Sequence, residues 1–354
     1  MRLRKKQAPA TAYLAMNSTK RVPATQLING EACSAYYNPT FYMESLELEH
    51  QEGDIIEVTQ HILIYVATNW RTLLYLKELL NRCNYRVTFP RTGTHLVQQM
   101  IQLLLNKGQS MRTFAEFTNR APFLEIQGLQ ESSSDAPRLL RTHLPMNRLR
   151  FSDKAKYVYV ARNPWDCCVS IFHMMRDFPL YDFADGTFED FLGTFLDGKF
   201  GFGDYFDHVL SGYEHRHDSN VFFVTYEEIH RDKAGVVFRL ARFLGEEYGD
   251  RVRSDSDLLK LVLERSSVEF MKDVLRTDAK GITQLLGRGY VPPVSGSEEA
   301  KRAKCSLVRK GKVGGWKSYF SAENVTQMQR KIDEKFEGTG IMSIWTDNEL
   351  GHKH

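Results

Sequence analysis

Cysteine is scarce in this chain, and its placement suits neither metal binding nor disulfide formation. Only five occur in 354 residues, and all but one adjacent pair are far apart: Cys33, Cys83, Cys167, Cys168 and Cys305. No C-x-x-C spacing occurs, which argues against a zinc site. The odd number and the wide spacing argue against a disulfide framework and suit a reducing compartment. We therefore expect no bound metal and a cytoplasmic location.

Long apolar runs and a strong charge of one sign are also missing. The longest apolar run, around residues 61–66, is far shorter than the ~20 residues that a membrane-spanning helix needs. The basic start of the chain, residues 1–6, is followed by no apolar stretch of the kind found in a signal peptide. The formal net charge is only +3, so we expect neither a nucleic-acid partner nor a membrane partner.

What the chain does contain is an alternation of short apolar strands and amphipathic helices. Strands are predicted at 85–89, 138–144, 157–161 and 221–226, and the main helices at 97–105, 108–117, 164–175, 183–195, 205–212, 233–244, 256–263 and 321–336. This order predicts an α/β fold: a single domain with a central parallel sheet flanked by helices. We expect a flexible arm at 1–35, the domain at 36–345 and a tail at 346–354. Residues 278–312 are rich in Gly, Pro and Lys and predict a long loop.

The segment Phe89-Pro-Arg-Thr-Gly-Thr-His95 is the first candidate site. It follows a predicted strand, turns at Gly93 and leads directly into an amphipathic helix. Backbone N–H groups and the helix dipole at such a turn favour an anion, so the segment predicts a P-loop-like phosphate-binding strand-turn-helix. An ordinary strand-to-helix turn is the alternative for this segment alone. The Walker A spacing G-x-x-x-x-G-K-[ST] is absent.

Two further segments carry cations at positions suited to phosphate. Arg162 directly follows the strand 157–161, and Asn163-Pro164 is typical of a helix start. Arginine binds two phosphate oxygens at once, although pairing with a nearby acid such as Asp166 is an equally good interpretation of this segment alone. Arg309 and Lys310 lie in a Gly-rich stretch that by itself could be only a solvated loop.

Taken together and in this order, the three segments resemble the cytosolic sulfotransferases, which use 3′-phosphoadenosine 5′-phosphosulfate (PAPS) as donor. The first is similar to that family's Y-P-K-S-G-T-T-W loop and the second to its Y-V-A-R-N-x-x-D-x-x-V-S element. The stretch Val308-Arg-Lys-Gly311 with Gly314-Gly-Trp-Lys317 resembles its R-K-G-x-x-G-D-W-K loop. The resemblance covers roughly 28–58 and 85–345.

The resemblance implies a metal-free, in-line transfer of a sulfuryl group from PAPS to a hydroxyl or amine of a small molecule. His143 matches the family's general base, a role that neutral imidazole suits. The other implied catalytic residues are Arg91, Arg141 and Ser170. The implied donor-binding residues are Arg91, Thr92, Gly93, Thr94, His95, Arg162, Ser170, Tyr226, Ser266, Arg309, Lys310 and Gly311.

Several departures from the family pattern keep a second interpretation open. Arg91 replaces a lysine, and a guanidinium cannot place a point charge in the same way. Leu96 and Val268 stand where the family often has aromatic residues beside the adenine. Residues 59–84 form an atypical insertion before the first motif. The alternative function is therefore a weak or inactive sulfotransferase-like protein that binds PAPS or its product, 3′-phosphoadenosine 5′-phosphate (PAP). The family's dimer motif survives only at Lys317, so we expect a monomer or a weak homodimer.

Aromatic residues after the second motif could line an acceptor pocket, although packing in the core is the favoured interpretation for each of them. These residues are Phe172, Phe178, Tyr181, Phe183 and Phe202.

Overall fold

The computed structural model describes residues 25–28, 31–34, 83–124, 138–149, 151–178, 181, 183–199, 202–278, 304–305 and 307–346. The predicted C-terminal tail lies outside these ranges except for residue 346, and so does the predicted insertion except for its last two residues. Within the predicted N-terminal arm, strand β1 (Thr25–Ile28) pairs antiparallel with β2 (Glu31–Ser34). The Asn29-Gly30 dipeptide, which separates these strands in the sequence, is a hairpin signal that the sequence analysis did not use.

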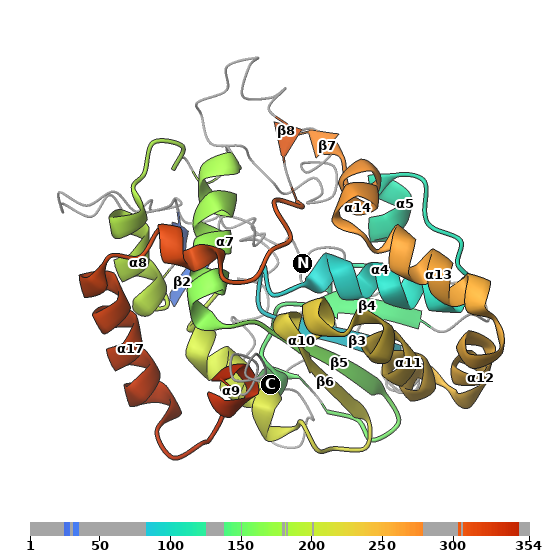
Figure 1. The fold of residues 1–354 in the computed structure, drawn as a ribbon. Coiled ribbons are helices and arrows are strands. Elements are labelled where there is room, and N and C mark those ends of the chain that lie inside the picture. Colours follow the sequence, from blue (N-terminus) through green and yellow to red (C-terminus); the bar gives the residue numbers. More distant parts are fainter. Residues whose placement is uncertain are drawn as a thin grey trace, which may run out of the picture.

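A four-stranded parallel sheet is the centre of the molecule (Figure 1). Its order is β4 (Arg138–Thr142), β3 (Cys83–Thr88), β5 (Lys156–Ala161) and β6 (Val221–Thr225). The predicted α/β fold with a central parallel sheet is confirmed. β3 begins at Cys83, so the last two residues assigned to the insertion belong to the sheet.

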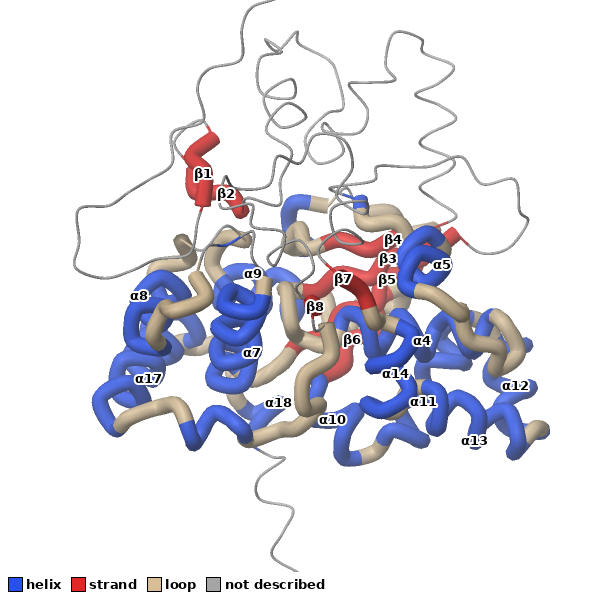
Figure 2. The backbone as a smooth tube through the Cα atoms, turned by 90° about the horizontal axis from the view of Figure 1, so that it is seen from above, coloured by secondary structure: helices blue, strands red, loops and turns tan. Residues whose placement is uncertain are grey.

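The helices form two layers, one on each face of the sheet (Figure 2). One layer contains α4 (Thr94–Leu105), α11 (Lys233–Leu244), α12 (Glu246–Ser254) and α13 (Ser256–Arg265). The other contains α7 (Pro164–Asp177), α8 (Phe188–Leu196), α9 (Tyr205–Glu214) and α17 (Ala322–Phe336). Shorter elements complete the described chain: α5 (Phe114–Asn119), η1 (Met146–Arg148), α10 (Tyr226–Arg231), α14 (Val268–Val274), β7 (Thr277–Asp278), β8 (Lys304–Cys305), η3 (Gly315–Ser318) and α18 (Ser343–Thr346).

Alternation along the strands explains why both faces of the sheet are buried. In β5, Tyr157 and Tyr159 belong to the apolar cluster under α7 and α9, whereas Val158 and Val160 belong to the cluster under α4 and α11. Successive side chains of a strand point to opposite faces, so a strand covered on both sides appears as a continuous apolar run. This is the pattern from which the strand was predicted.

Two predicted helices have different bounds in the structure. The segment predicted as 108–117 is a turn followed by α5 at Phe114–Asn119, because the side chain of Thr113 caps the helix by accepting from Glu116 N–H. Helix α8 likewise starts late, at Phe188, where Thr187 and Asp190 form a reciprocal capping box. The highly charged α12 was not predicted, because it buries little more than Gly249 and Val252.

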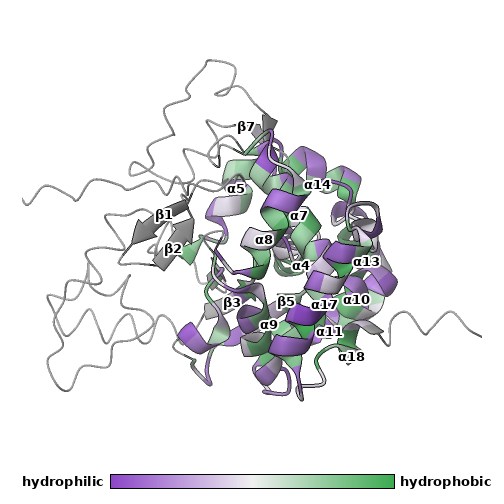
Figure 3. Ribbon diagram, turned by 90° about the vertical axis from the view of Figure 1, so that its left-hand side faces the viewer, coloured by the Kyte–Doolittle hydropathy of each residue, from purple (hydrophilic) through white to green (hydrophobic). Residues whose placement is uncertain are grey.

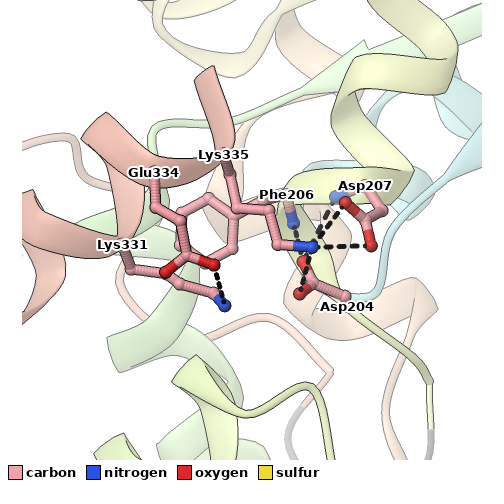
Figure 4. Close-up of polar contacts among 6 residues, drawn as sticks. All are labelled: Asp204, Phe206, Asp207, Lys331, Glu334 and Lys335. Carbon is pink, nitrogen blue, oxygen red and sulfur yellow. Dashed lines mark hydrogen bonds and ion pairs between the residues drawn. The ribbon is translucent and has the colours of Figure 1, made fainter. Parts of the chain in front are cut away.

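Helix α17 packs on the layer of α7, α8 and α9 through one apolar stripe. Met328, Ile332 and Phe336 are buried at four-residue spacing, and the hydrophilic residues of this helix face outward (Figure 3). Its last turn is tied to the start of α9 by Lys335, whose ammonium donates to Asp207 at 2.8 and 2.9 Å and lies 3.3 Å from Asp204 (Figure 4). Contacts this exposed contribute only about 0–1 kcal/mol each, so the apolar stripe supplies most of the attachment.

Candidate active site

The carboxyl ends of all four parallel strands lead into one cavity. Arg91 follows β3, His143 follows β4, Arg162 follows β5 and Tyr226 follows β6, and each of these residues lines the cavity. Strands that run in parallel end at the same edge of the sheet, so residues far apart in sequence meet there. The loop at 307–312 closes over the same cavity.

The turn after β3 is built around Gly93. Its φ is +121°, and a Cβ there would lie 3.0 Å from Tyr226 Cδ2 and 3.3 Å from Val160 Cγ1. Only glycine fits this conformation and this space without strain. Thr94 opens α4 and its hydroxyl is 2.7 Å from that of Thr88. The hydroxyl of Thr92 instead donates to the Phe89 carbonyl at 2.8 Å and holds the turn; Thr92 is fully buried and does not line the cavity.

Arg91 takes a left-handed backbone conformation, with φ +68°. Its Nε donates to Ser170 Oγ at 3.2 Å and its Nη1 donates to the Leu307 carbonyl at 2.9 Å. The guanidinium therefore connects the phosphate turn to α7 and to the closing loop. Burial, together with the neighbouring charges of Arg162 and Arg309, lowers the pKa of Arg91 to about 10, so it stays a cation at neutral pH.

Arg162 is buried and is not paired with Asp166. It donates from Nη1 to the carbonyl of Arg91 at 3.1 Å and from Nη2 to the carbonyl of Lys312 at 3.2 Å, and its guanidinium lies 4.3 Å from the centre of the Tyr226 ring. Its Nε is buried and makes no hydrogen bond. The carbonyls themselves neutralise no charge, and the carboxylate that interacts with Arg162 electrostatically, Glu227, does not line the cavity, whereas Arg162 does.

The closing loop brings Arg309, Lys310 and Gly311 to the same end of the cavity. Gly311 has φ +60°, and a Cβ there would lie 2.2 Å from Val268 Cγ2. The loop is therefore seated directly on the start of α14. Five cationic residues from three chain segments line this end: Arg91, Arg162, Arg309, Lys310 and Lys312. No Asp or Glu is among the described residues that line the cavity.

His143 lies on the wall beyond the arginines and is held in one tautomer. Its Nδ1 is 2.6 Å from the Thr88 carbonyl, a contact that requires a proton on Nδ1, so in the neutral ring Nε2 is the nitrogen that carries the lone pair. The ring packs edge-on against Phe123 and Phe202. Burial, with smaller effects of Arg141 and His208, lowers the pKa of His143 to about 3 although the Thr88 contact opposes this. The imidazole is neutral at physiological pH, the state that accepts a proton.

Arg141 and His95 lie beside His143. Arg141 Nη1 is 3.3 Å from His95 Nε2, and its guanidinium is 4.8 Å from the centre of the Phe123 ring. Burial and the charge of Arg141 hold the pKa of His95 well below its usual range. Both residues line the cavity, so their predicted place at the site agrees with the geometry.

Next to the cationic end, the cavity is lined by Tyr226, Ser266, Val268 and two residues that the sequence analysis missed, His230 and Lys233. His230 lies one helical turn after Tyr226 on α10, a spacing that could have identified it. Its ring centre is 4.4 Å from that of Tyr226. Lys233 Nζ donates to the Ser266 carbonyl at 3.0 Å.

The remaining wall is apolar. Phe178, Tyr181 and Phe202 line it, although the sequence favoured the core for each of them, whereas Phe172 and Phe183 are packed in the core. The sequence analysis did not single out the other apolar residues of this wall: Leu96, Phe114, Phe123, Met174 and Met271. Within the described ranges, no cluster of three or more His, Cys, Asp or Glu side chains suits a metal ion, and no helix is long and apolar enough to cross a membrane.

The carboxyl ends of the four parallel strands thus meet at a cationic cavity that His95, His143 and His230 also line. Comparison with known families identifies the class: residues 87–340 match the sulfotransferase domain, and the chain belongs to that family.

Among curated proteins, rabbit (Oryctolagus cuniculus) amine sulfotransferase is 29% identical over 82% of this chain and 95% of its own length. Rat (Rattus norvegicus) sulfotransferase 1C2 is 30% identical over 72% of this chain and 83% of its own length. The mouse sulfotransferase SULT7A1, solved with PAP, is 25% identical, has a TM-score of 0.53 and covers 74% of this chain and 86% of its own. Retinol dehydratase, solved with androsterone and PAP, shares the fold. It is 22% identical, has a TM-score of 0.58 and covers 75% of this chain and 86% of its own.

Proposed function

We propose that this protein transfers a sulfuryl group from PAPS to a hydroxyl, or an amine, of a small-molecule acceptor. One observation carries the proposal: a single cavity is lined by cations, by a histidine whose Nδ1 is bound to the Thr88 carbonyl, and by an apolar aromatic wall. Two relatives support the same reaction: one is named an amine sulfotransferase, and the other, the sulfotransferase SULT7A1, was solved with PAP.

PAPS fits the cationic end. We assign the 5′-phosphosulfate to the turn at Arg91–Thr94, where α4 begins and its backbone N–H groups are free to bind an anion. We assign the 3′-phosphate to Arg162 and to Arg309, Lys310 and Gly311 of the closing loop. Arg162 lines the cavity, and its guanidinium can give a bound phosphate a charge-assisted hydrogen bond.

The acceptor would lie against the aromatic wall with its oxygen or nitrogen at His143 Nε2. The Nδ1–H donated to the Thr88 carbonyl holds the ring in the tautomer that can take a proton from the acceptor as the bond to sulfur forms. The sulfuryl group leaves the phosphate oxygen at the same time, and the charge that develops there is stabilised by Arg91 and by the turn N–H groups. Ser170 orients Arg91 through its 3.2 Å contact, and Arg141 adds positive charge beside His143.

A second candidate function is nucleotide binding without turnover. It is favoured by Leu96 and Val268, which both line the cavity and offer no aromatic ring for stacking on a base. Loss of such stacking would weaken binding by about 0.5–1.5 kcal/mol for each aromatic pair.

Two measurements separate these candidates. Calorimetry with PAP tests for the nucleotide site, and transfer of labelled sulfate from PAPS to a panel of phenols, alcohols and amines tests for turnover, with His143→Ala as the control for chemistry. Binding with turnover that His143→Ala abolishes supports the enzyme. Binding without turnover on any acceptor supports the second candidate, and absence of PAP binding overturns both.

A further inference from the structure

A buried carboxylate outside the cavity holds the closing loop in place. Asp166 is 2% exposed, lies in the first turn of α7 and does not line the cavity. Its Oδ2 accepts from Gly314 N–H at 2.6 Å and its Oδ1 accepts from Trp316 N–H at 3.0 Å. These two amides lie 148 and 150 residues further along the chain and directly follow the cationic segment 309–312.

The position of Asp166 is itself fixed by the turn after β5. Asn163, the N-cap of α7, accepts from Asp166 N–H at 2.8 Å and donates from its side-chain nitrogen to Asp166 Oδ2 at 3.1 Å. The same nitrogen donates to Glu227 Oε1 at 2.6 Å, and Glu227 Oε2 accepts from Trp345 Nε1 at 3.1 Å. A buried network of hydrogen bonds thus joins the ends of β5 and β6, the closing loop and the C-terminal helix α18.

The other contacts of the loop do not replace Asp166. Arg91 and Arg162 donate to the carbonyls of Leu307 and Lys312, on the cavity side. Both arginines would also have to serve a bound anion, so their hold on the loop depends on the ligand. Trp316 packs on Trp165 with ring centres 5.6 Å apart, and such an apolar contact does not position the backbone as a directed hydrogen bond does. Among the described residues, Asp166 is the one whose side chain accepts from the N–H groups of Gly314 and Trp316, in the turn that follows Arg309 and Lys310.

We propose that Asp166 is a positioning residue for the donor: it fixes the loop that carries Arg309, Lys310 and Gly311 and so prearranges the site for the 3′-phosphate. The identity of this phosphate rests on the proposed function. The attachment of the closing loop to Asp166, here called the latch, follows from the two hydrogen bonds alone. Charge-assisted bonds to backbone N–H are about twice as strong as neutral ones, so removing both leaves the loop free to move. The ordering cost would then be added to donor binding.

Asp166→Ala is the test, and Asp190→Ala is its matched control. Asp190 occupies the same third position of helix α8 and accepts from its own N-cap, Thr187, but its side-chain hydrogen bonds go to Thr187 and not to the closing loop. The first readout needs no ligand. Amide hydrogen exchange at Gly314 and Trp316 should become about 10-fold faster or more in Asp166→Ala and remain unchanged in Asp190→Ala. Unchanged exchange at both amides would overturn the proposal.

The second readout tests the link to the donor. Asp166→Ala should raise the Kd of PAP and the KM of PAPS by about 10-fold and leave kcat at saturating donor within about twofold. The Kd of adenosine 5′-phosphate, which lacks the 3′-phosphate, should change little. Asp166→Asn keeps one acceptor oxygen, so its Kd for PAP and its KM for PAPS should lie between those of the wild type and of Asp166→Ala.

The outcomes distinguish the latch from the proposed function. Fast exchange with no loss of PAP affinity, or an equal loss for both nucleotides, would refute the positioning role while leaving the proposed function intact. If wild-type protein binds neither nucleotide, the proposed function fails; the exchange result then still decides whether Asp166 latches the loop. Unfolding midpoints of all variants, measured in parallel, identify any general loss of structure, and Asp166→Asn then serves as the test variant.

Discussion

Replacing Arg162 by methionine is the most direct test of the phosphate assignment. Methionine keeps an unbranched side chain against the Tyr226 ring, so the packing beneath the guanidinium is largely retained. What is lost is the positive charge, the two bonds to the carbonyls of Arg91 and Lys312, and the buried Nε, which makes no hydrogen bond.

The expected change in affinity can be worked out by comparing two ligands, PAP and adenosine 5′-phosphate, which differ only in the 3′-phosphate. The bonds to the carbonyls affect PAP and adenosine 5′-phosphate alike, because they hold the protein and not the 3′-phosphate. The contact with that phosphate affects PAP alone and, as a charge-assisted hydrogen bond, is worth about 1.5–3 kcal/mol. The ratio of the two affinities should therefore fall by about 10- to 150-fold in Arg162→Met.

Isothermal calorimetry with both nucleotides, at one fixed salt concentration, measures this ratio. Arg176→Met is the matched control: this arginine lies in the last turn of α7, stacks on Phe172 and donates to a backbone carbonyl, but it does not line the cavity. The control should leave the ratio unchanged. An equal weakening of both nucleotides by Arg162→Met would refute the assignment of the 3′-phosphate to this residue.

Three further predictions concern the base, the pH dependence of stability and the cation of the turn. His143→Ala should lower kcat by about 10²–10⁴-fold with the Kd of PAP within twofold, and an equal loss of binding would make the residue structural. Burial lowers the pKa of His208 to about 4 in the fold, so the unfolded chain binds more protons between pH 4 and 6.5 and stability falls with falling pH in that window. Urea unfolding should show about 2 kcal/mol less stability at pH 5 than at pH 7 from this group, a difference that should shrink in His208→Gln. Arg91→Lys should raise the KM of PAPS severalfold, because one ammonium cannot reach both Ser170 and the Leu307 carbonyl; an unchanged KM in steady-state kinetics would show that this bridge does not contribute to donor binding.

The sequence by itself determined the elements that carry the site and the chemical types of its residues. The apolar run 157–161 followed by Arg162 and an Asn-Pro helix start could form little else than a buried strand, a turn and a capped helix, and the structure has β5 and α7 there. Gly93 marked the turn before α4 because its backbone conformation and its close neighbours exclude a Cβ. His143 could be named from the resemblance, since it directly follows a strand in a recognisable motif.

Only the tertiary structure decided which hydrogen-bond partners these residues have. Thr92, expected to face a ligand, gives its hydroxyl to the turn, and Asp166, a possible partner of Arg162, instead accepts from the loop at Gly314 and Trp316. The link from Arg91 to Leu307 spans 216 residues, and no periodicity or spacing encodes such a contact. Parallel strands end at the same edge of a sheet, whatever the length of the connections between them. Local sequence therefore determines each strand and helix, whereas the register between strands determines which polar groups meet.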